Sequence, residues 1–326
     1  MRVAVTGASG FVGGAVCRLL REHGWQVHAF GRRPAVPPDH LAGAGYRSWD
    51  VATGPLHRPP EVDAVVHAAG YVSDAGPGGP LGQVLQGDPG RRAVAVNVDG
   101  TGHVIGTWPA ARLVLVSSAS VYHPDRPQRG AVEGEAPDPA TVRWPSAYGP
   151  TKALAERLVL QRHPAAVVLR PHAVYGPGDT TLLPRVTAAV RGRTLLLPGS
   201  GRQRHSLTRV EQLAEACRLA CTAPDAAVGR VYNIADAEPV VLAEALGEAL
   251  AARGRPVRVV PVGRHAAAAA AALSQWRHRR SDEAHQGLTP YAAGHLARDR
   301  TFDLTIGRRL LGYHPQPTRL DDAARW

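Results

Sequence analysis

The chain has 326 residues, of which 44% are hydrophobic and 20% charged, so it can bury a large core as one large domain or two smaller ones. Its formal net charge of +11 comes from arginines scattered along the sequence, and only 5% of residues are aromatic, so we expect no nucleic-acid partner. The apolar run from Ala266 to Leu273 is too short to span a membrane.

Cysteine usage and the N-terminus both favour a cytoplasmic location. The 3 cysteines are too few and too scattered for a disulfide framework. Cys217 and Cys221 lie one turn apart on a predicted helix but lack a second pair, so we predict buried apolar thiols and no metal site. The sequence enters a strand-like run at once, without the pattern of a signal peptide.

The first structural signal is a glycine-rich turn between a strand, residues 2–6, and an amphipathic helix. Gly7 permits a tight turn, Gly10 lets the backbone approach a pyrophosphate, and Gly13 lets the helix pack closely on the strand. The N-terminus of the helix then points its free N–H groups at the phosphates. The predicted dinucleotide-binding residues of this turn are Thr6, Gly7, Ser9, Gly10, Phe11, Val12 and Gly13.

The second predicted strand, residues 26–30, is followed by Gly31-Arg32-Arg33. An NAD site usually carries an acid here to bind the ribose hydroxyls, whereas a guanidinium binds a 2′-phosphate. Arg32 and Arg33 therefore favour NADP(H), with NAD(H) left open. After the third strand, residues 46–49, Asp50 and Val51 are expected at the adenine edge, or Asp50 simply caps the next turn.

The fourth predicted strand ends in His67-Ala68-Ala69-Gly70, where small residues would let a nicotinamide ribose lie against the backbone. A histidine that ends a buried strand favours a structural role over a catalytic one. Residues 73–90 are rich in glycine and proline and predict a loop before a helix through Asn97. The fifth strand, residues 113–116, leads into Ser117 to Ser120, whose hydroxyls are expected to face the ligand crevice. The alternative, which suits Ser117 and Ser120 best, is that they merely cap the backbone.

Lys152 is the only lysine of the chain, and it follows Tyr148 by four residues. On a helix these two side chains lie on the same face, so the ammonium and the phenol converge. A primary amine is compact and can shift its pKa, which a guanidinium does not do. Tyr148 and Lys152 are therefore the predicted centre of the chemistry. Pro150 fits between them if the helix begins near Tyr148, because proline is tolerated in the first turn.

The alternation of strands and helices predicts an α/β fold with a Rossmann-type, doubly wound parallel sheet. We assign residues 1–170 to a dinucleotide-binding domain. Residues 171–326 are expected to form a smaller, mostly helical substrate-binding region that is partly interwoven with the first.

These motifs follow one another as in extended short-chain dehydrogenases/reductases, which the chain resembles over nearly its full length. The resemblance is strongest to the 3β-hydroxysteroid dehydrogenase-like branch, which includes bacterial reductases of 2-alkyl-3-oxoalkanoates. Besides the glycine turn, it rests on His67-Ala68-Ala69, Asn97-Val98-Asp99-Gly100-Thr101, Ser117-Ser118-Ala119-Ser120-Val121-Tyr122, Tyr148-x-x-x-Lys152 and Arg170-Pro171-x-x-Val174-Tyr175-Gly176-Pro177-Gly178-Asp179.

The resemblance implies a role for each matching residue. Tyr148 would be the general acid or base, and Lys152 would lower the pKa of the phenol and hold the nicotinamide ribose. Ser118 would hydrogen-bond the substrate oxygen, and Asn97 would join a water relay to the lysine. Pro171 and Val174 would line the cofactor site.

The predicted activity is NADP(H)-dependent reduction of a ketone, or oxidation of the secondary alcohol, in a small hydrophobic substrate of the β-keto or 3β-hydroxy type. A nucleotide-sugar epimerase or 4-ketoreductase is the alternative, with a diphosphate held by Arg193, Arg202, Arg204 or Arg209. A cofactor-binding regulator without catalysis is a third class. A homodimer is left open, and the run from Ala266 to Leu273 with Trp276 either lines a substrate lid or packs on the core.

Overall fold

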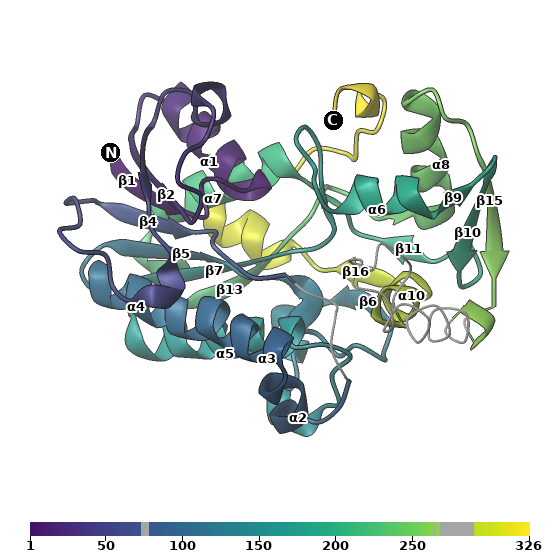
Figure 1. Ribbon diagram of the computed structural model, residues 1–326, viewed down its shortest axis with the longest axis horizontal. Helices are drawn as coiled ribbons and strands as arrows, with labels where there is room; N and C mark the ends of the chain where they lie inside the picture. Colours follow the sequence, from purple (N-terminus) through teal and green to yellow (C-terminus); the bar gives the residue numbers. More distant parts are fainter. Residues whose placement is uncertain (73–77, 264, 268–289) are drawn as a thin grey trace.

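The computed structural model describes residues 1–72, 78–263, 265–267 and 290–326 (Figure 1). Its centre is a parallel seven-stranded sheet with the strand order β13-β7-β5-β4-β1-β2-β3. The predicted Rossmann-type sheet is thus confirmed. In chain order its strands are β1 Arg2–Thr6, β2 Gln26–Gly31, β3 Gly45–Ser48, β4 Ala64–His67, β5 Arg112–Val116, β7 Ala166–Pro171 and β13 Arg230–Ile234.

Helices cover both faces of this sheet, as Figure 1 shows. One face packs against α1 (Phe11–Glu22) and α7 (Val210–Cys221), and the other against α4 (Gly100–Thr107) and α5 (Tyr148–Arg162). The central strands are mostly apolar, as strands buried on both faces are, and their polar residues, such as Thr6, His67 and Arg170, are buried as well. Within the described part of the chain, every helix is too short or too polar to cross a bilayer.

The two cysteines of α7 belong to the core on the α1 side of the sheet. Burial raises the pKa of Cys221 to about 12 and that of Cys217 well above its ordinary value. Both thiols are therefore protonated and unreactive near neutral pH, and the prediction of buried apolar cysteines is confirmed.

Residues after β7 contribute β13 to the central sheet and α7 to one of its faces. Most of the others form a second layer, together with β6 from before β7. That layer holds short strands as well as helices, in three small sheets of order β15-β10-β9, β14-β11-β16-β6 and β12-β8. Its helices are α6 Leu182–Ala189, α8 Leu242–Ala252 and α10 Pro290–Leu296. Its strands are β6 Gln128–Ala131, β8 Val174–Tyr175, β9 Val190–Arg191, β10 Thr194–Pro198, β11 Arg204–His205, β12 Thr208–Arg209, β14 Val240–Val241, β15 Arg258–Val262 and β16 Arg300–Phe302.

The prediction of a loop over residues 73–90 is wrong from residue 81 on, where the chain is helical. Here α2 covers Leu81–Gln86 and α3 covers Asp88–Val94, which continues through a π-helical turn, Ala95–Asp99, into α4. Proline in the first turn of α3 costs no hydrogen bond. Gly90 packs against the end of α2, where a Cβ would lie 2.3 Å from the Val84 carbonyl oxygen. Residues 73–77 lie outside the described residues.

Helix α1 meets the end of β1 at backbone distance. A Cβ placed on Gly13 would lie 2.3 Å from the carbonyl oxygen of Gly7 and 2.8 Å from the Cα of Ala8, closer than atoms approach. Only glycine therefore lets the helix start directly above the strand end, which fixes the direction of α1 over the sheet.

Gly13→Ala should lower the free energy of unfolding by about 1–3 kcal/mol, because the added methyl group has no room. Urea denaturation measures this. The matched control is Gly106→Ala on α4, where no atom lies within 4 Å of the added carbon, and it should gain up to about 1 kcal/mol from the higher helix propensity of alanine. Equal losses in both variants would contradict the proposed contact.

Candidate active site

From β1 the chain adds β2 and β3 on one side of the sheet and then β4, β5, β7 and β13 on the other. The carboxyl ends of the parallel neighbours β1 and β4 lie side by side at this switch point. Gly7 has φ of +71°, and a Cβ on it would lie 2.5 Å from the backbone nitrogen of Ala69. The N–H of Gly10 closes the turn by donating to the Gly7 carbonyl at 2.9 Å. The first turn of α1, which begins at Phe11, contains no acid. This cradle of backbone N–H groups fits a pyrophosphate.

The turn after β2 is held by a tyrosine that the sequence analysis did not single out. The hydroxyl of Tyr46 lies 2.6 Å from the Arg33 carbonyl oxygen and 2.9 Å from that of Gly31. A Cβ on Gly31 would lie 2.6 Å from Ser9 Oγ, so the turn packs directly on the glycine-rich loop. The side chains of Arg32 and Arg33 are exposed, and neither is paired with an acid among the described residues.

Asp50 and Val51 follow β3 and begin a short helical turn. The Asp50 carboxylate accepts a hydrogen bond from the backbone N–H of Ala52 at 3.0 Å, which is the capping role considered for it. Val51 is buried, and its carbonyl oxygen lies 2.7 Å from Nδ1 of His103 on α4.

His67 is fully buried, and both of its ring nitrogens have protein partners. Nδ1 lies 2.6 Å from the hydroxyl of Thr6, and Nε2 lies 3.0 Å from that of Thr101. Because Thr101 donates its own proton to the Asn97 carbonyl at 2.6 Å, it must accept the proton of Nε2. Burial, followed by the charge of Lys152, lowers the pKa of His67 to about 3. His67 is a neutral link between β1, β4 and α4.

The side-chain amide of Asn97 joins the β4 end to α5. Its oxygen accepts from the backbone N–H of Tyr71 at 2.8 Å, and its nitrogen donates to the Thr151 hydroxyl at 3.0 Å and to the Tyr71 carbonyl at 3.1 Å. Between Asn97 and the lysine lies Gly70, whose Cβ would be 3.5 Å from the amide oxygen and 3.8 Å from Lys152 Nζ. Asn97 and the ammonium therefore both border the same glycine.

Helix α5 begins at Tyr148, which confirms the predicted position of Pro150 in the first turn. Gly149 makes a close contact that the sequence analysis missed. A Cβ on it would lie 2.5 Å from the Ser120 carbonyl oxygen. Ser118 caps the turn Ala119–Val121 by accepting the N–H of Ser120 at 3.1 Å. The first turn of α5 is thus packed on the segment that carries Ser118.

Lys152 lies one turn further along α5, and its side chain is buried. Nζ donates a hydrogen bond to the carbonyl oxygen of Val116, the last residue of β5, at 2.6 Å. Burial lowers the pKa of Lys152 to about 8, and the negative charge of Glu156 opposes this shift. The ammonium is therefore close to titrating near neutral pH, as is useful in acid–base chemistry.

The remaining predicted cofactor residues lie around the same edge of the sheet. Pro171 ends β7, and Val174 begins β8, which pairs with β12. A Cβ on Gly178 would lie 3.7 Å from the ring of Phe11, so the segment after β8 touches the start of α1. Val12 is partly buried against the core.

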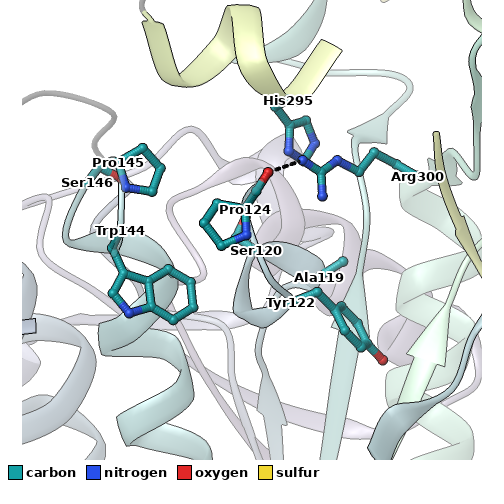
Figure 2. A pocket seen from close by; sticks show the side chains of 10 residues that line it. Ala119, Ser120, Tyr122, Pro124, Trp144, Pro145, Ser146, His295 and Arg300 are labelled. Carbon is teal, nitrogen blue, oxygen red and sulfur yellow. Dashed lines mark hydrogen bonds between the residues drawn. The ribbon is translucent and has the colours of Figure 1, made fainter. Parts of the chain in front are cut away.

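A small pocket adjoins Gly149, next to the Tyr148 position (Figure 2). Hydroxyls, aromatic rings, an arginine and a histidine form its wall, which consists of Ala119, Ser120, Tyr122, Pro124, Trp144, Pro145, Ser146, Gly149, His295 and Arg300. Burial lowers the pKa of His295 well below its ordinary value. Arg300 donates to the Pro124 carbonyl at 2.7 Å, and His295 Nε2 lies 2.8 Å from His172 Nε2. The sequence analysis missed His295 and Arg300, because no local motif marks them.

The sheet order, the glycine cradle and the tyrosine–lysine helix define an NAD(P)-dependent oxidoreductase of the extended short-chain dehydrogenase/reductase type. Residues 3–235 match the NAD dependent epimerase/dehydratase family, and the chain belongs to this family. Its relatives place it in the 3β-hydroxysteroid dehydrogenase-like branch, as its motifs predicted.

Two relatives align along nearly the whole chain. A 2-alkyl-3-oxoalkanoate reductase from Stenotrophomonas maltophilia is 34% identical over 97% of this chain and 95% of its own. A 3-beta-hydroxysteroid dehydrogenase from Mycolicibacterium neoaurum is 29% identical over 96% of this chain and 87% of its own.

Among solved structures, MoeE5 in complex with UDP-glucuronic acid and NAD has a TM-score of 0.69 and 24% identity over 99% of this chain and 96% of its own. UDP-glucuronic acid 4-epimerase from Bacillus cereus, in complex with NAD, has a TM-score of 0.70 and 18% identity over 100% and 96%.

Acid should destabilise the protein, because its buried histidines are held neutral. An unfolded histidine has a pKa of about 6.5, whereas burial lowers that of His67 to about 3. Between these values the unfolded state binds more protons, so the free energy of unfolding falls as the pH drops below about 6.5.

His67→Gln should remove about 1.4 kcal/mol per pH unit from this dependence. Urea denaturation between about pH 7 and about pH 5 measures it, and the exposed His57→Gln should keep the wild-type dependence. A His67→Gln dependence as steep as that of the wild type would contradict the neutral histidine.

Proposed function

We propose that the protein is an NADP(H)-dependent oxidoreductase that reduces the ketone of a hydrophobic β-keto substrate, or oxidises the corresponding secondary alcohol. The observation that carries this proposal is the junction of β5 and α5. There Ser118, Tyr148 and Lys152 come from two elements in contact, beside the glycine cradle that fits a dinucleotide.

In the proposed reaction, Tyr148 transfers its phenolic proton to the carbonyl oxygen, and the same phenolate takes the proton back from the alcohol in the reverse direction. A nicotinamide dinucleotide, when bound, supplies the hydride for reduction and accepts it in oxidation. A free phenol has a pKa of about 10, so the ammonium of Lys152, one turn along α5, is needed to stabilise the phenolate. The hydroxyl of Ser118 orients the substrate oxygen.

The substrate class is supported by the two relatives, whose names describe a 2-alkyl-3-oxoalkanoate and a 3β-hydroxysteroid. The rings of Tyr122, Trp144 and Pro145 line the small pocket beside Gly149. This pocket is too small for a substrate, so the relatives alone support the substrate class.

A nucleotide sugar is less well supported as substrate. Among the arginines considered for a diphosphate, Arg209 is already paired with Asp322 at 2.6 Å and with Glu211 at 3.1 Å. Arg204 donates to the Pro239 carbonyl at 2.8 Å. The solved neighbours that bind UDP-sugars share the fold at no more than 24% identity. The cytoplasmic location and the homodimer stay predictions.

Tyr148→Phe should lower kcat for ketone reduction by about 10²–10⁴-fold, because the phenolic proton donor is lost while the ring remains. Steady-state assays with NADPH and a 2-alkyl-3-oxoalkanoate measure this. Tyr232→Phe is the matched control, since among the described residues the hydroxyl of this buried tyrosine donates to the Ala227 carbonyl, on the edge strand β13. Wild-type turnover by Tyr148→Phe would refute the proposed role.

NADPH should be used with a kcat/KM at least about tenfold above that for NADH, because two exposed guanidinium groups next to the ribose position favour a 2′-phosphate. Replacing Arg32 and Arg33 together by alanine should bring the two values within about threefold of each other. Arg92→Ala, on α3, should leave the ratio unchanged. A clear preference of the wild type for NADH would overturn the NADP(H) assignment.

A further inference from the structure

Lys152 and Glu156 lie one turn apart on the buried side of α5, and both contact the end of β5. Lys152 donates to the carbonyl oxygen of Val116 at 2.6 Å, and the hydroxyl of Ser117 donates to the Glu156 carboxylate. Ser118 is the next residue. The last residue of β5 and the residue after it are thus fixed by two charged side chains of one helix, immediately before the serine proposed to orient the substrate.

Glu156 is itself held from the neighbouring strand, β7. Arg170 donates from Nε to one carboxylate oxygen at 2.9 Å and from Nη2 to the other at 2.6 Å, and both side chains are buried. The remaining side of the guanidinium donates to the Glu133 carbonyl at 2.8 Å and lies over the ring of Tyr122. A two-point bond of this kind leaves the carboxylate little freedom to move.

The position of Glu156 matters because Lys152 is a buried cation. Burial penalises the ammonium and lowers the pKa of Lys152 to about 8, while the charge of Glu156 acts in the opposite direction. The phenol of Tyr148, one turn earlier on α5, is uncharged in its protonated form. The polar groups that the described residues place near the ammonium from other elements carry no compensating charge. His67 from β4 is neutral, Asn97 is an amide, and the carbonyl of Val116 is a dipole. The cation of Arg170 lies beyond Glu156 and is bound to it.

We infer that Glu156 is a positioning residue for the proposed reaction, because it keeps the amine of Lys152 protonated and, through Ser117, fixes the segment that carries Ser118. Its effect on turnover rests on the proposed function. Its effect on the charge of Lys152 does not, and the two are measured separately.

The single lysine makes the charge state directly observable. Protein grown with lysine labelled with ¹³C at Cε gives one lysine signal in an NMR spectrum, and its shift follows the protonation of Lys152. In the wild type without cofactor, this signal should titrate with a midpoint of about pH 8.

Two variants test the counter-charge. Glu156→Gln removes it alone but leaves Arg170 buried without its partner, so Glu156→Gln/Arg170→Met removes both charges together and avoids that cost. In Glu156→Gln the midpoint should fall by about one pH unit or more. In the double variant it should fall by less, because the like charge of Arg170 is removed as well. Ser117→Ala and Glu215→Gln should keep the wild-type midpoint. Glu215 is the matched control, since it also pairs with an arginine, Arg218 at 2.6 Å, but lies on α7. An unchanged midpoint in folded Glu156→Gln, or a raised one in the folded double variant, would overturn the inference.

Kinetics then test the consequence for the reaction. In Glu156→Gln, the loss of kcat/KM for ketone reduction at alkaline pH should begin about one pH unit lower than in the wild type. Ser117→Ala should lower kcat about tenfold without moving that limb, because Ser118 loses its support. A uniform loss at every pH in the Glu156 variants would show a purely structural role and overturn the inference. A shifted NMR midpoint in an enzyme that reduces no ketone would refute the proposed function and leave the counter-charge in place.

Discussion

One buried ammonium sets most of the constraints at this site. Lys152 has a backbone carbonyl as hydrogen-bond acceptor, and the opposing charge of Glu156 is fixed by the next strand. For the amine to reach the β5 end, α5 must begin at Tyr148 and lie against the turn after Ser118, which leaves no room for a side chain on Gly149. Gly149 and Lys152 therefore serve one requirement, which is the close packing of the first turn of α5 on the end of β5.

The parts of the fold that could be predicted are those whose signal is local. Apolar runs marked the central strands, because strands buried on both faces carry few polar residues. Proline marked the start of α5, since it fits only the first turn. Strand β7 extends to Pro171 because all of β13, Arg230–Ile234, pairs with Val167–Pro171. This contact joins segments some sixty residues apart, and no local pattern predicts it. The helices in residues 81–94 were missed because tertiary packing of Gly90 decides that segment.

The site follows the same division. Glycine cradle, serine turn and tyrosine–lysine helix each carry a recognisable pattern, and the structure brings them to one edge of the sheet. Arg300 reaches the pocket because β16 pairs with β6, and His295 reaches it from α10, where its ring lies against that of His172. Both places depend on contacts between distant segments. The lid suggested for residues 266–273 with Trp276 falls largely outside the described residues.

Three arginines of this structure show what a guanidinium does that the amine at position 152 does not. Arg170, Arg209 and Arg218 each bind a carboxylate through two N–H groups, a geometry that the planar guanidinium provides and an ammonium does not. Lys152 instead donates to a carbonyl, in a buried site where its proton is held only weakly. A guanidinium there would stay charged whatever its surroundings, whereas the charge of the amine depends on Glu156. At position 152 the side chain is therefore one whose ionisation is set by its neighbour Glu156.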